Sequence, residues 1–227
     1  MDAAVVAAYV LSVVEPYSAG IGGGGFLLYR DAASQKTAVV DYREVAPKKA
    51  HRDMYLVDGK VAPKKSVEGI FAVGVPGMVP GLDEAQKRFG KKTLGQSLDA
   101  AIRLADEGFK VLPKFHRTSV YRRDLIRANP AAAKIFLKNS EPYKVGETVI
   151  QKDLAETLRT LKKEGAKLFT HGAIAQAIAK ESERLGGILT LEDLQEFKTR
   201  WRQPITVEYR GHEITTMPLP SSGGTHI

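Results

Sequence analysis

The sequence contains no cysteine. This absence excludes disulfide bonds, thiolate ligands for a metal and a cysteine nucleophile. Long hydrophobic runs are also missing, because the longest, residues 3–14, is interrupted by Ser12 and falls short of the about 20 residues that a membrane-spanning helix needs. No basic residues precede this run, as they would in a secretory signal peptide. Either the chain is cytosolic or its natural N-terminus lies upstream, and a helix that begins after only Met1 and Asp2 favours the second explanation.

The composition is that of a soluble globular protein. The 227 residues are 43% hydrophobic and 26% charged, which excludes wholesale disorder, collagen-like repeats and a coiled coil. The net charge is +8 and is concentrated in two blocks, with +4 in residues 48–65 and +7 in residues 86–130. Basic blocks can attract nucleic acid, anionic lipid or acidic substrates, although a solvated face is the commoner explanation.

Hydrophobic periodicity predicts an α+β fold rather than alternating βαβ units. Residues 2–14 should form a helix buried on most sides, and two β-hairpins are expected at 26–42 and 204–217, the second turning at Arg210-Gly211. Residues 48–80 are rich in proline and glycine and are predicted to be irregular. Helices are expected over residues 82–89, 93–107, 114–127, 153–164 and 172–185, and in a shorter helix capped by Thr190 and Asp193.

Three features set the ends and faces of these helices. Thr93 and Gln96 form a capping-box pattern, and Gly108 and Gly165 are expected at helix C-termini. The apolar residues expected to face inward are Phe115, Val120, Leu125 and Ile126 in the helix at 114–127 and Leu154, Leu158 and Leu161 in the helix at 153–164.

A run of glycines at residues 22–25 lies between the first helix and the first strand. Glycine allows close approach of backbone to a ligand or to another backbone. A phosphate-binding loop would need a lysine followed by serine or threonine and a helix, neither of which follows here. Tight packing of helix against strand is therefore the expected role.

Arg43 follows the expected strand 37–42 and precedes Glu44 and Pro47. A planar guanidinium suits bidentate binding of a carboxylate. The alternative is a surface pairing of Arg43 with Glu44 or Asp41, and the residue pattern alone favours that alternative.

Other candidate sites have simpler explanations. Ser221 and Ser222 lack an adjacent base, so capping of a helix that begins near the end of the chain is favoured over a nucleophilic role. Residues 114–127 interleave basic and aromatic residues, which could bind nucleic acid, but a solvated helix face is favoured. The five histidines, His51, His116, His171, His212 and His226, show no metal-binding spacing and are expected to be surface or structural residues.

Six segments, in order, resemble the γ-glutamyltranspeptidase family. Residues 2–26 resemble its DAAVA…VxEPxxSGxGGGGF signature, and the others match its D-x-R-E-x-A-P, GVPG, LAxxGF, QKDLA and YRGY…MPPPSSGGxH segments. These five lie at residues 41–47, 74–77, 104–109, 147–154 and 209–226. The chain departs from the pattern at Leu219, where proline is usual, and at Ala19, where serine is usual.

The resemblance implies an N-terminal-nucleophile hydrolase with a four-layer αββα sandwich, made as a zymogen that cleaves itself into a large and a small subunit. A threonine at the new N-terminus would attack γ-glutamyl compounds such as glutathione, using its own amine as base. A γ-glutamyl-enzyme would then react with water or an amino acid, without a cofactor or a metal. The family also implies a periplasmic or secreted protein.

The resemblance assigns one substrate-binding residue, Arg43, which matches the family arginine that holds the substrate's α-carboxylate. It assigns no catalytic residue, because the nucleophile belongs to the small subunit, and neither Thr215-Thr216 nor Thr225-His226 matches its position. Residues 1–227 are thus expected to be an incomplete large-subunit part of one domain that is inactive alone. Its regions would be the sandwich strands and buried helix (1–80), a helical region (81–200) and the second hairpin with the SSGG loop (201–227).

Alternatives remain open at this point. A related acylase of the same family, for example one acting on β-lactam side chains or poly-γ-glutamate, would share these motifs. A non-catalytic basic binding module would use the positive blocks, although nucleic acid is not an expected partner. An inert gene fragment would expose unpaired strand edges and aggregate.

Overall fold

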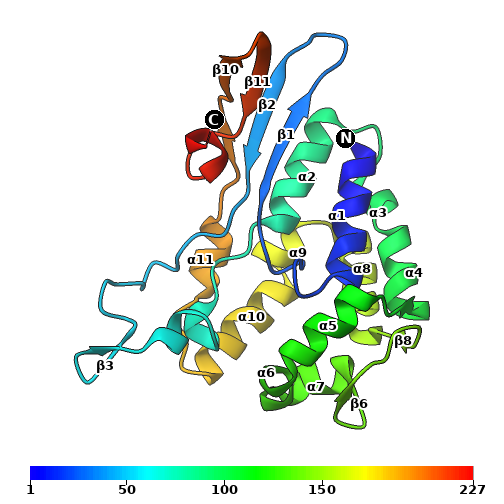
Figure 1. Ribbon diagram of the computed structural model, residues 1–227, viewed down its shortest axis with the longest axis vertical. Helices are drawn as coiled ribbons and strands as arrows, with labels where there is room; N and C mark the ends of the chain where they lie inside the picture. Colours follow the sequence, from blue (N-terminus) through cyan, green and yellow to red (C-terminus); the bar gives the residue numbers. More distant parts are fainter. Residues whose placement is uncertain (227) are drawn as a thin grey trace. The chain divides into compact units, whose positions relative to one another are not determined.

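A computed structural model describes residues 1–226. The chain forms two compact units. The first unit comprises Met1, residues 21–89 and the chain from 166 onward, and the second comprises residues 2–20 and 90–165. Both helices and strands are present, so the predicted α+β class is confirmed (Figure 1). Within the described residues, no helix combines the length and the hydropathy that crossing a lipid bilayer requires.

The first unit is built on a three-stranded antiparallel sheet in the order β1-β2-β9. The strands are β1 (Phe26–Arg30), β2 (Thr37–Asp41) and β9 (Arg200–Arg202). The predicted hairpin at 26–42 is confirmed, with Leu28 paired to Val39 and Leu27 to Val40. Val39 and Val40 are fully buried although they point to opposite faces, so both faces of the central strand are covered at this position.

Helix α2 (Met78–Phe89) lies alongside the β1–β2 hairpin (Figure 1). The helix begins at Met78, four residues before the predicted start. The Gly23 carbonyl accepts hydrogen bonds from the N–H groups of Gly77 and Met78, both at 2.9 Å, and so satisfies donors that a helix start leaves unpaired. Pro80 falls in the first turn, where its missing N–H costs no helical hydrogen bond.

Short elements complete the first unit. Residues 48–77 contain only the hairpin β3 (Leu56–Val57) and β4 (Lys60–Val61) and the 3₁₀ turns η1 (Pro63–Ser66) and η2 (Ile70–Ala72), close to the predicted irregular segment. Helices α9 (Lys167–Thr170), α10 (Ala173–Arg184) and α11 (Leu191–Glu196) follow. The buried residues that gather around them are Val75, Ala175, Leu189 and Leu194.

The second predicted hairpin is confirmed as β10 (Ile205–Tyr209) and β11 (His212–Thr216). Its two turn residues, Arg210 and Gly211, have φ values of 51° and 77°, as the tight two-residue turns of β-hairpins require. A 3₁₀ turn, η3 (Ser222–Thr225), ends the described chain.

In the second unit, helices α1 (Asp2–Val14), α3 (Leu94–Ser97), α4 (Asp99–Glu107) and α8 (Lys152–Glu164) pack together. Helix α1 buries one stripe, formed by Val5, Tyr9, Ser12 and Val13, while Leu11 is 47% exposed. The exposed residues of this helix, at 3, 4, 7 and 11, share one face and the others are buried or half-buried, so the expected burial on most sides is confirmed.

Glycines end two of these helices as predicted. Gly108 follows α4 with φ +93°, and Gly165 follows α8 with φ +79°. Leu158 and Leu161 are fully buried in α8, and Leu154 is partly buried. The capping box of Thr93 is present, but Leu98 separates its short helix from α4.

The predicted helix at 114–127 is broken into α5 (Pro113–Tyr121) and α6 (Arg123–Ala128). Phe115 and Ile126 are buried as expected, but Val120 is 49% and Leu125 43% exposed. The expectation for these two is wrong because neither shares a helical face with its buried neighbour: Val120 lies about 140° around α5 from Phe115, and Leu125 about 100° around α6 from Ile126. The two helices are separated by a break at Arg122, with φ −97° and ψ 8°. The remaining elements of this unit are β5 (Phe109–Lys110), α7 (Pro130–Phe136), β6 (Leu137–Lys138), β7 (Glu141–Pro142) and β8 (Thr148–Val149).

Candidate functional site

The candidate site is the segment that follows β2, residues 41–48. Its backbone is held on two sides. Tyr42 exchanges hydrogen bonds with Gly25, at 2.9 Å from the Tyr42 N–H and 3.3 Å from the Gly25 N–H. The Val45 carbonyl accepts the N–H of Val75 at 2.8 Å, in an isolated antiparallel bridge. Arg43 therefore projects from a backbone that is anchored immediately before and after it.

Tyr42 is surrounded by glycines. A Cβ added at Gly24 or Gly77 would lie 2.5 or 2.1 Å from the Tyr42 carbonyl oxygen, and one added at Gly81 would lie 2.1 Å from the Tyr42 Cβ. Burial of this side chain raises the pKa of its phenol. The glycines thus let two segments, the glycine run and the start of α2, close on one residue, and they fix the position of the peptide that leads into Arg43.

The glycine run has the predicted packing role, but its partner differs from the expectation. Gly24 and Gly25 contact Tyr42 and Glu44, at the end of a strand and just beyond it, rather than the first helix. A Cβ at Gly22 would meet no atom within 4 Å. Close packing against another segment therefore requires glycine at position 24 but not at position 22.

Asp41 divides its carboxylate between two arginines. Its Oδ1 accepts the backbone N–H of Arg43 at 3.1 Å, and its Oδ2 accepts Nε of Arg202 at 2.7 Å. Asp41 is 5% exposed, and the Arg202 side chain is 28% exposed. The expected surface pairing of the Arg43 guanidinium with Asp41 is therefore wrong, because Arg202 occupies that carboxylate.

The Arg43 guanidinium is exposed and lightly bonded. Nη1 donates to the Pro220 carbonyl at 3.3 Å, and Cζ lies 6.0 Å from the centroid of the Phe26 ring. Among residues 1–226 no carboxylate forms an ion pair with Arg43, and Glu44 is no exception. A guanidinium has five N–H donors, so most of them are available to a ligand.

Lys48 and Asp193 anchor the far end of the segment. The Lys48 N–H donates to Asp193 Oδ1 at 2.8 Å, while Asp193 Oδ2 accepts the N–H and hydroxyl of Thr190 at 2.8 and 2.7 Å. Burial acts to raise the pKa of Asp193, but these hydrogen bonds outweigh it and lower the pKa below its ordinary value. Hydrogen bonds to Glu192 and Glu196 raise the pKa of Lys48. The capping box predicted at Thr190 thus also tethers residue 48.

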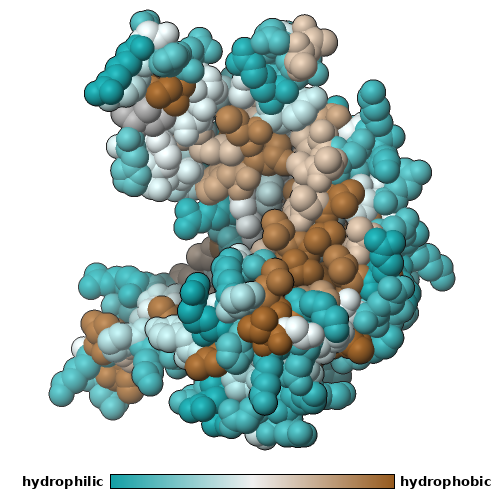
Figure 2. All heavy atoms as spheres, turned by 45° about the vertical axis from the view of Figure 1, so that its right-hand side comes forward, coloured by the Kyte–Doolittle hydropathy of each residue, from teal (hydrophilic) through white to brown (hydrophobic). Residues whose placement is uncertain are grey.

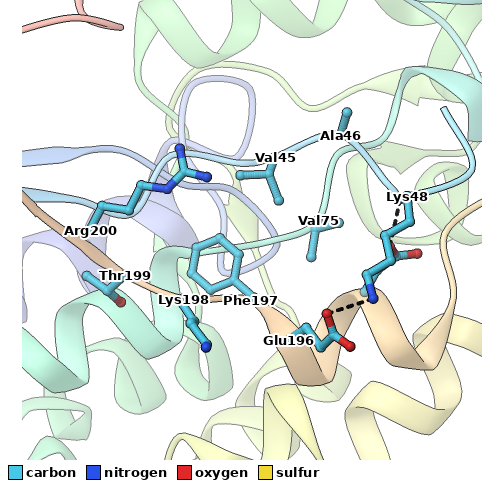
Figure 3. Close-up of a pocket in the computed structure, with 10 residues that line it drawn as sticks. Val45, Ala46, Lys48, Val75, Glu196, Phe197, Lys198, Thr199 and Arg200 are labelled. Atoms are coloured by element: carbon cyan, nitrogen blue, oxygen red, sulfur yellow. Dashed lines mark hydrogen bonds and ion pairs between the residues drawn. The ribbon is translucent and has the colours of Figure 1, made fainter. Parts of the chain in front are cut away.

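A pocket of about 450 Å³ lies along the same segment. Figure 3 shows Phe197 near its centre, with Val45 and Val75 beside the ring and the Lys48–Glu196 pair to one side. Its remaining lining residues are Ala46, Asp193, Lys198, Thr199 and Arg200. Arg43 is not among them, so the structure does not bring the predicted binding residue and this pocket together.

Other residues singled out from the sequence have structural roles. Ser221 caps η3, since its Oγ accepts the N–H of Gly223 at 3.3 Å, as the capping prediction requires. His116 Nδ1 lies 2.7 Å from the Tyr143 carbonyl oxygen. No group of three or more histidine, aspartate or glutamate side chains in the described part of the chain could hold a metal ion.

The basic segment at 114–127 is partly neutralised within its own unit. Lys114 pairs with Glu15 at 2.8 Å, and Arg127 pairs with Glu141 at 2.5 Å. Arg123 also lies near Glu141, at 3.8 Å. These pairs reduce the charge that the segment offers to a polyanion, in agreement with the solvated-face interpretation.

Sequence reasoning missed Arg202. The signal was faint, because an arginine near a strand end has no distinguishing spacing to an aspartate more than 150 residues earlier. A buried aspartate at the end of a strand implies a cationic partner, but only the pairing of β2 with β9 identifies which residue it is.

Comparisons with known proteins agree with the motif resemblance. A family model described as Gamma-glutamyltranspeptidase matches residues 1–227. The glutathione hydrolase proenzyme of Escherichia coli (strain K12) is 40% identical over 100% of this chain and 39% of its own length. The capsule biosynthesis protein CapD proenzyme of Bacillus anthracis is 37% identical over 99% of this chain and 38% of its own length.

A solved structure gives the same result. The crystal structure of Helicobacter pylori gamma-glutamyltranspeptidase superposes with a TM-score of 0.95 and 41% identity, covering 99% of this chain and 65% of that one. The chain therefore shares the fold of that enzyme over nearly all its length. It spans about two fifths of the length of the two curated relatives.

Proposed function

Because the chain belongs to the gamma-glutamyltranspeptidase family, we propose that it is the part of a γ-glutamyl-transferring and glutathione-hydrolysing enzyme that holds the substrate's α-carboxylate. The observation that carries this proposal is the state of Arg43. Its guanidinium is exposed, it has no carboxylate partner among the described residues, and the adjacent backbone is fixed by Tyr42 and Val45.

Physical chemistry favours a carboxylate as the ligand of Arg43. The guanidinium and a carboxylate match in a bidentate geometry, and charge-assisted hydrogen bonds are about twice as strong as neutral ones. Because the backbone is anchored before binding, little ordering of the protein would oppose the contact. Glutathione and other γ-glutamyl compounds carry a free α-carboxylate next to the α-amine, so they present the group that Arg43 would recognise.

The reacting groups would come from elsewhere in the same precursor. We propose that a small subunit, released by autocatalytic cleavage, supplies an N-terminal threonine as nucleophile. Its amine would act as base, and a γ-glutamyl-enzyme would form and then react with water or an amino acid. The proenzyme name of the E. coli relative and the two-fifths share of its length support this division. Residues 1–227 would then form an incomplete part of the large subunit and would be inactive alone.

A chromogenic γ-glutamyl anilide tests the proposal. The complete gene product should release the anilide, and glutathione should compete with it. The isolated 227-residue chain should release none. Absence of turnover by the complete, processed protein would reject the function, and turnover by the isolated chain would reject the division of labour.

A related transpeptidase or acylase of the family is the second candidate. The 37% identity to the capsule biosynthesis proenzyme is close to the 40% identity to the glutathione hydrolase proenzyme, so this part of the chain matches both about equally. Inhibition of anilide turnover by glutathione and by poly-γ-glutamate, measured in the same assay, distinguishes the two candidate functions. Stronger inhibition by glutathione supports the hydrolase, and stronger inhibition by the polymer supports the alternative.

A further inference from the structure

We propose that Arg202 is a positioning residue for substrate binding that acts on Arg43 through the carboxylate of Asp41. The inference rests on the proposed role of Arg43 and goes beyond it, because Arg202 itself would not touch the substrate. Three charged side chains, on the neighbouring strands β2 and β9 and on the segment that follows β2, would then work as one unit.

The first step is the state of Asp41. Its side chain is 5% exposed, and a buried carboxylate is costly unless it is paired and hydrogen-bonded. Arg202 meets this need with a hydrogen bond of 2.7 Å from Nε to Oδ2. This leaves Oδ1 to accept the Arg43 N–H at 3.1 Å.

The second step is the strand register. In the antiparallel pair β2–β9, Asp41 lies opposite Arg200, while Arg202 lies opposite Val39. Arg202 is therefore diagonal to Asp41 on the same face of the sheet, within reach of a long side chain. The sheet supplies the geometry of the pair, so the position of the Asp41 carboxylate is set by two strands rather than by a loop.

The third step is the effect on Arg43. The hydrogen bond from its N–H to Asp41 fixes the peptide between Tyr42 and Arg43, and thus the direction in which the Arg43 side chain leaves the backbone. Arg202 also neutralises the carboxylate of Asp41, two residues before Arg43. Without Arg202, Asp41 would compete with the substrate for the Arg43 guanidinium.

A double-mutant cycle in the complete, processed protein tests the inference, with KM and kcat measured on the γ-glutamyl anilide. Arg202→Gln should raise KM by about tenfold, the size of one charge-assisted hydrogen bond, with a smaller change in kcat. Arg202→Lys should recover part of the loss, because it restores the charge but not the planar fork. The matched control is Arg30→Gln, at the opposite end of the same sheet, where the arginine side chain donates to Gln35 at 2.8 Å.

The decisive comparison is made in the Arg43→Ala background. If Arg202 acts through Arg43, Arg202→Gln should change KM there by less than about twofold, so the two effects are not additive. Equal effects of Arg202→Gln in both backgrounds would overturn the inference while the role of Arg43 stands. An unchanged KM in Arg43→Ala alone would instead reject the proposed function, and the inference with it. If Arg202→Gln does not fold, the same cycle with Arg202→Lys gives the answer.

Discussion

Gly81 of helix α2 lies so close to Tyr42 that a Cβ added to the glycine would stand 2.1 Å from the Tyr42 Cβ. Real Cβ atoms do not approach this closely, and neither atom can move away by rotating a side chain. The backbone of α2 at Gly81 thus lies directly against the base of the Tyr42 side chain, next to Arg43. A substitution at Gly81 should therefore affect both the stability of the fold and the position of the candidate site.

Gly81→Ala should therefore destabilise the protein. Alanine is favoured over glycine inside a helix by about 0.8–1 kcal/mol, but overpacking a filled interior costs about 1–3 kcal/mol and sometimes more. Because the clash involves atoms next to the backbone, we expect the upper part of that range and a net loss of about 1–2 kcal/mol. Thermal unfolding measures it.

Gly22→Ala is the matched control for this prediction. A Cβ there meets nothing within 4 Å, so the free energy of unfolding should change by no more than about 0.5 kcal/mol. Equal melting temperatures for Gly81→Ala and the wild type would show that α2 does not press on Tyr42.

The two C-capping glycines of the second unit allow backbone strain to be separated from packing. Gly108 and Gly165 have similar conformations, with φ +93° and ψ 167° and with φ +79° and ψ −178°, in a region that is nearly exclusive to glycine. A Cβ at Gly108 would also lie 2.5 Å from Cγ2 of Thr148, whereas one at Gly165 would meet nothing within 4 Å.

Alanine at Gly165 should therefore cost about 1–3 kcal/mol from strain alone, and alanine at Gly108 should cost measurably more. Denaturant unfolding of the two variants gives the difference. A larger loss for Gly165→Ala would contradict the packing assigned to Gly108.

Asp193 should make the stability of the first unit depend on pH. Burial opposes its charged form, but hydrogen bonds from Lys48 and Thr190 outweigh burial and lower its pKa in the folded protein. An unfolded aspartate takes up a proton near pH 3.9, so its contribution is complete above about pH 4 and is lost as the pH falls through the lower folded value.

Melting temperatures measured between pH 6 and pH 3 should fall, and Asp193→Asn should show a shallower fall. Asp106 adds to the wild-type slope, because hydrogen bonds from Lys152 outweigh desolvation and lower its pKa too. The slope of the variant should thus be reduced rather than abolished. An identical slope for wild type and Asp193→Asn would contradict the role of this carboxylate.

Much of the fold follows from local patterns in the sequence. The hairpin turn at Arg210-Gly211, the capping box of Thr190 and the C-terminal glycines of α4 and α8 were predictable, because each depends on residues close together in the chain. The break at Arg122 was not, since no proline or glycine marks it. Val120 and Leu125 are exposed because each lies off the helical face of its buried neighbour, Phe115 or Ile126.

The features of the candidate site also differ in whether local sequence predicts them. Arg43 was proposed from its motif, and the capping role of Ser221 follows from its capping preference. The pairing of Asp41 with Arg202 depends on strands that meet across more than 150 residues, which no local spacing records. The hairpin formed by β3 and β4, at lower left in Figure 1, was also not predicted, and it exposes Val57 and Val61 by 53% and 72%. Figure 2 shows apolar surface at its lower left.

The most direct test of the account is the preference of Arg43→Ala between two anilides in the complete, processed protein. One is the γ-glutamyl anilide, and the other is the 4-aminobutyryl anilide, which keeps the amine but lacks the α-carboxylate. Loss of a charge-assisted contact of about 1.5–3 kcal/mol should lower kcat/KM for the γ-glutamyl anilide by roughly 10- to 150-fold and leave the other nearly unchanged. An equal loss on both substrates would contradict carboxylate recognition by Arg43.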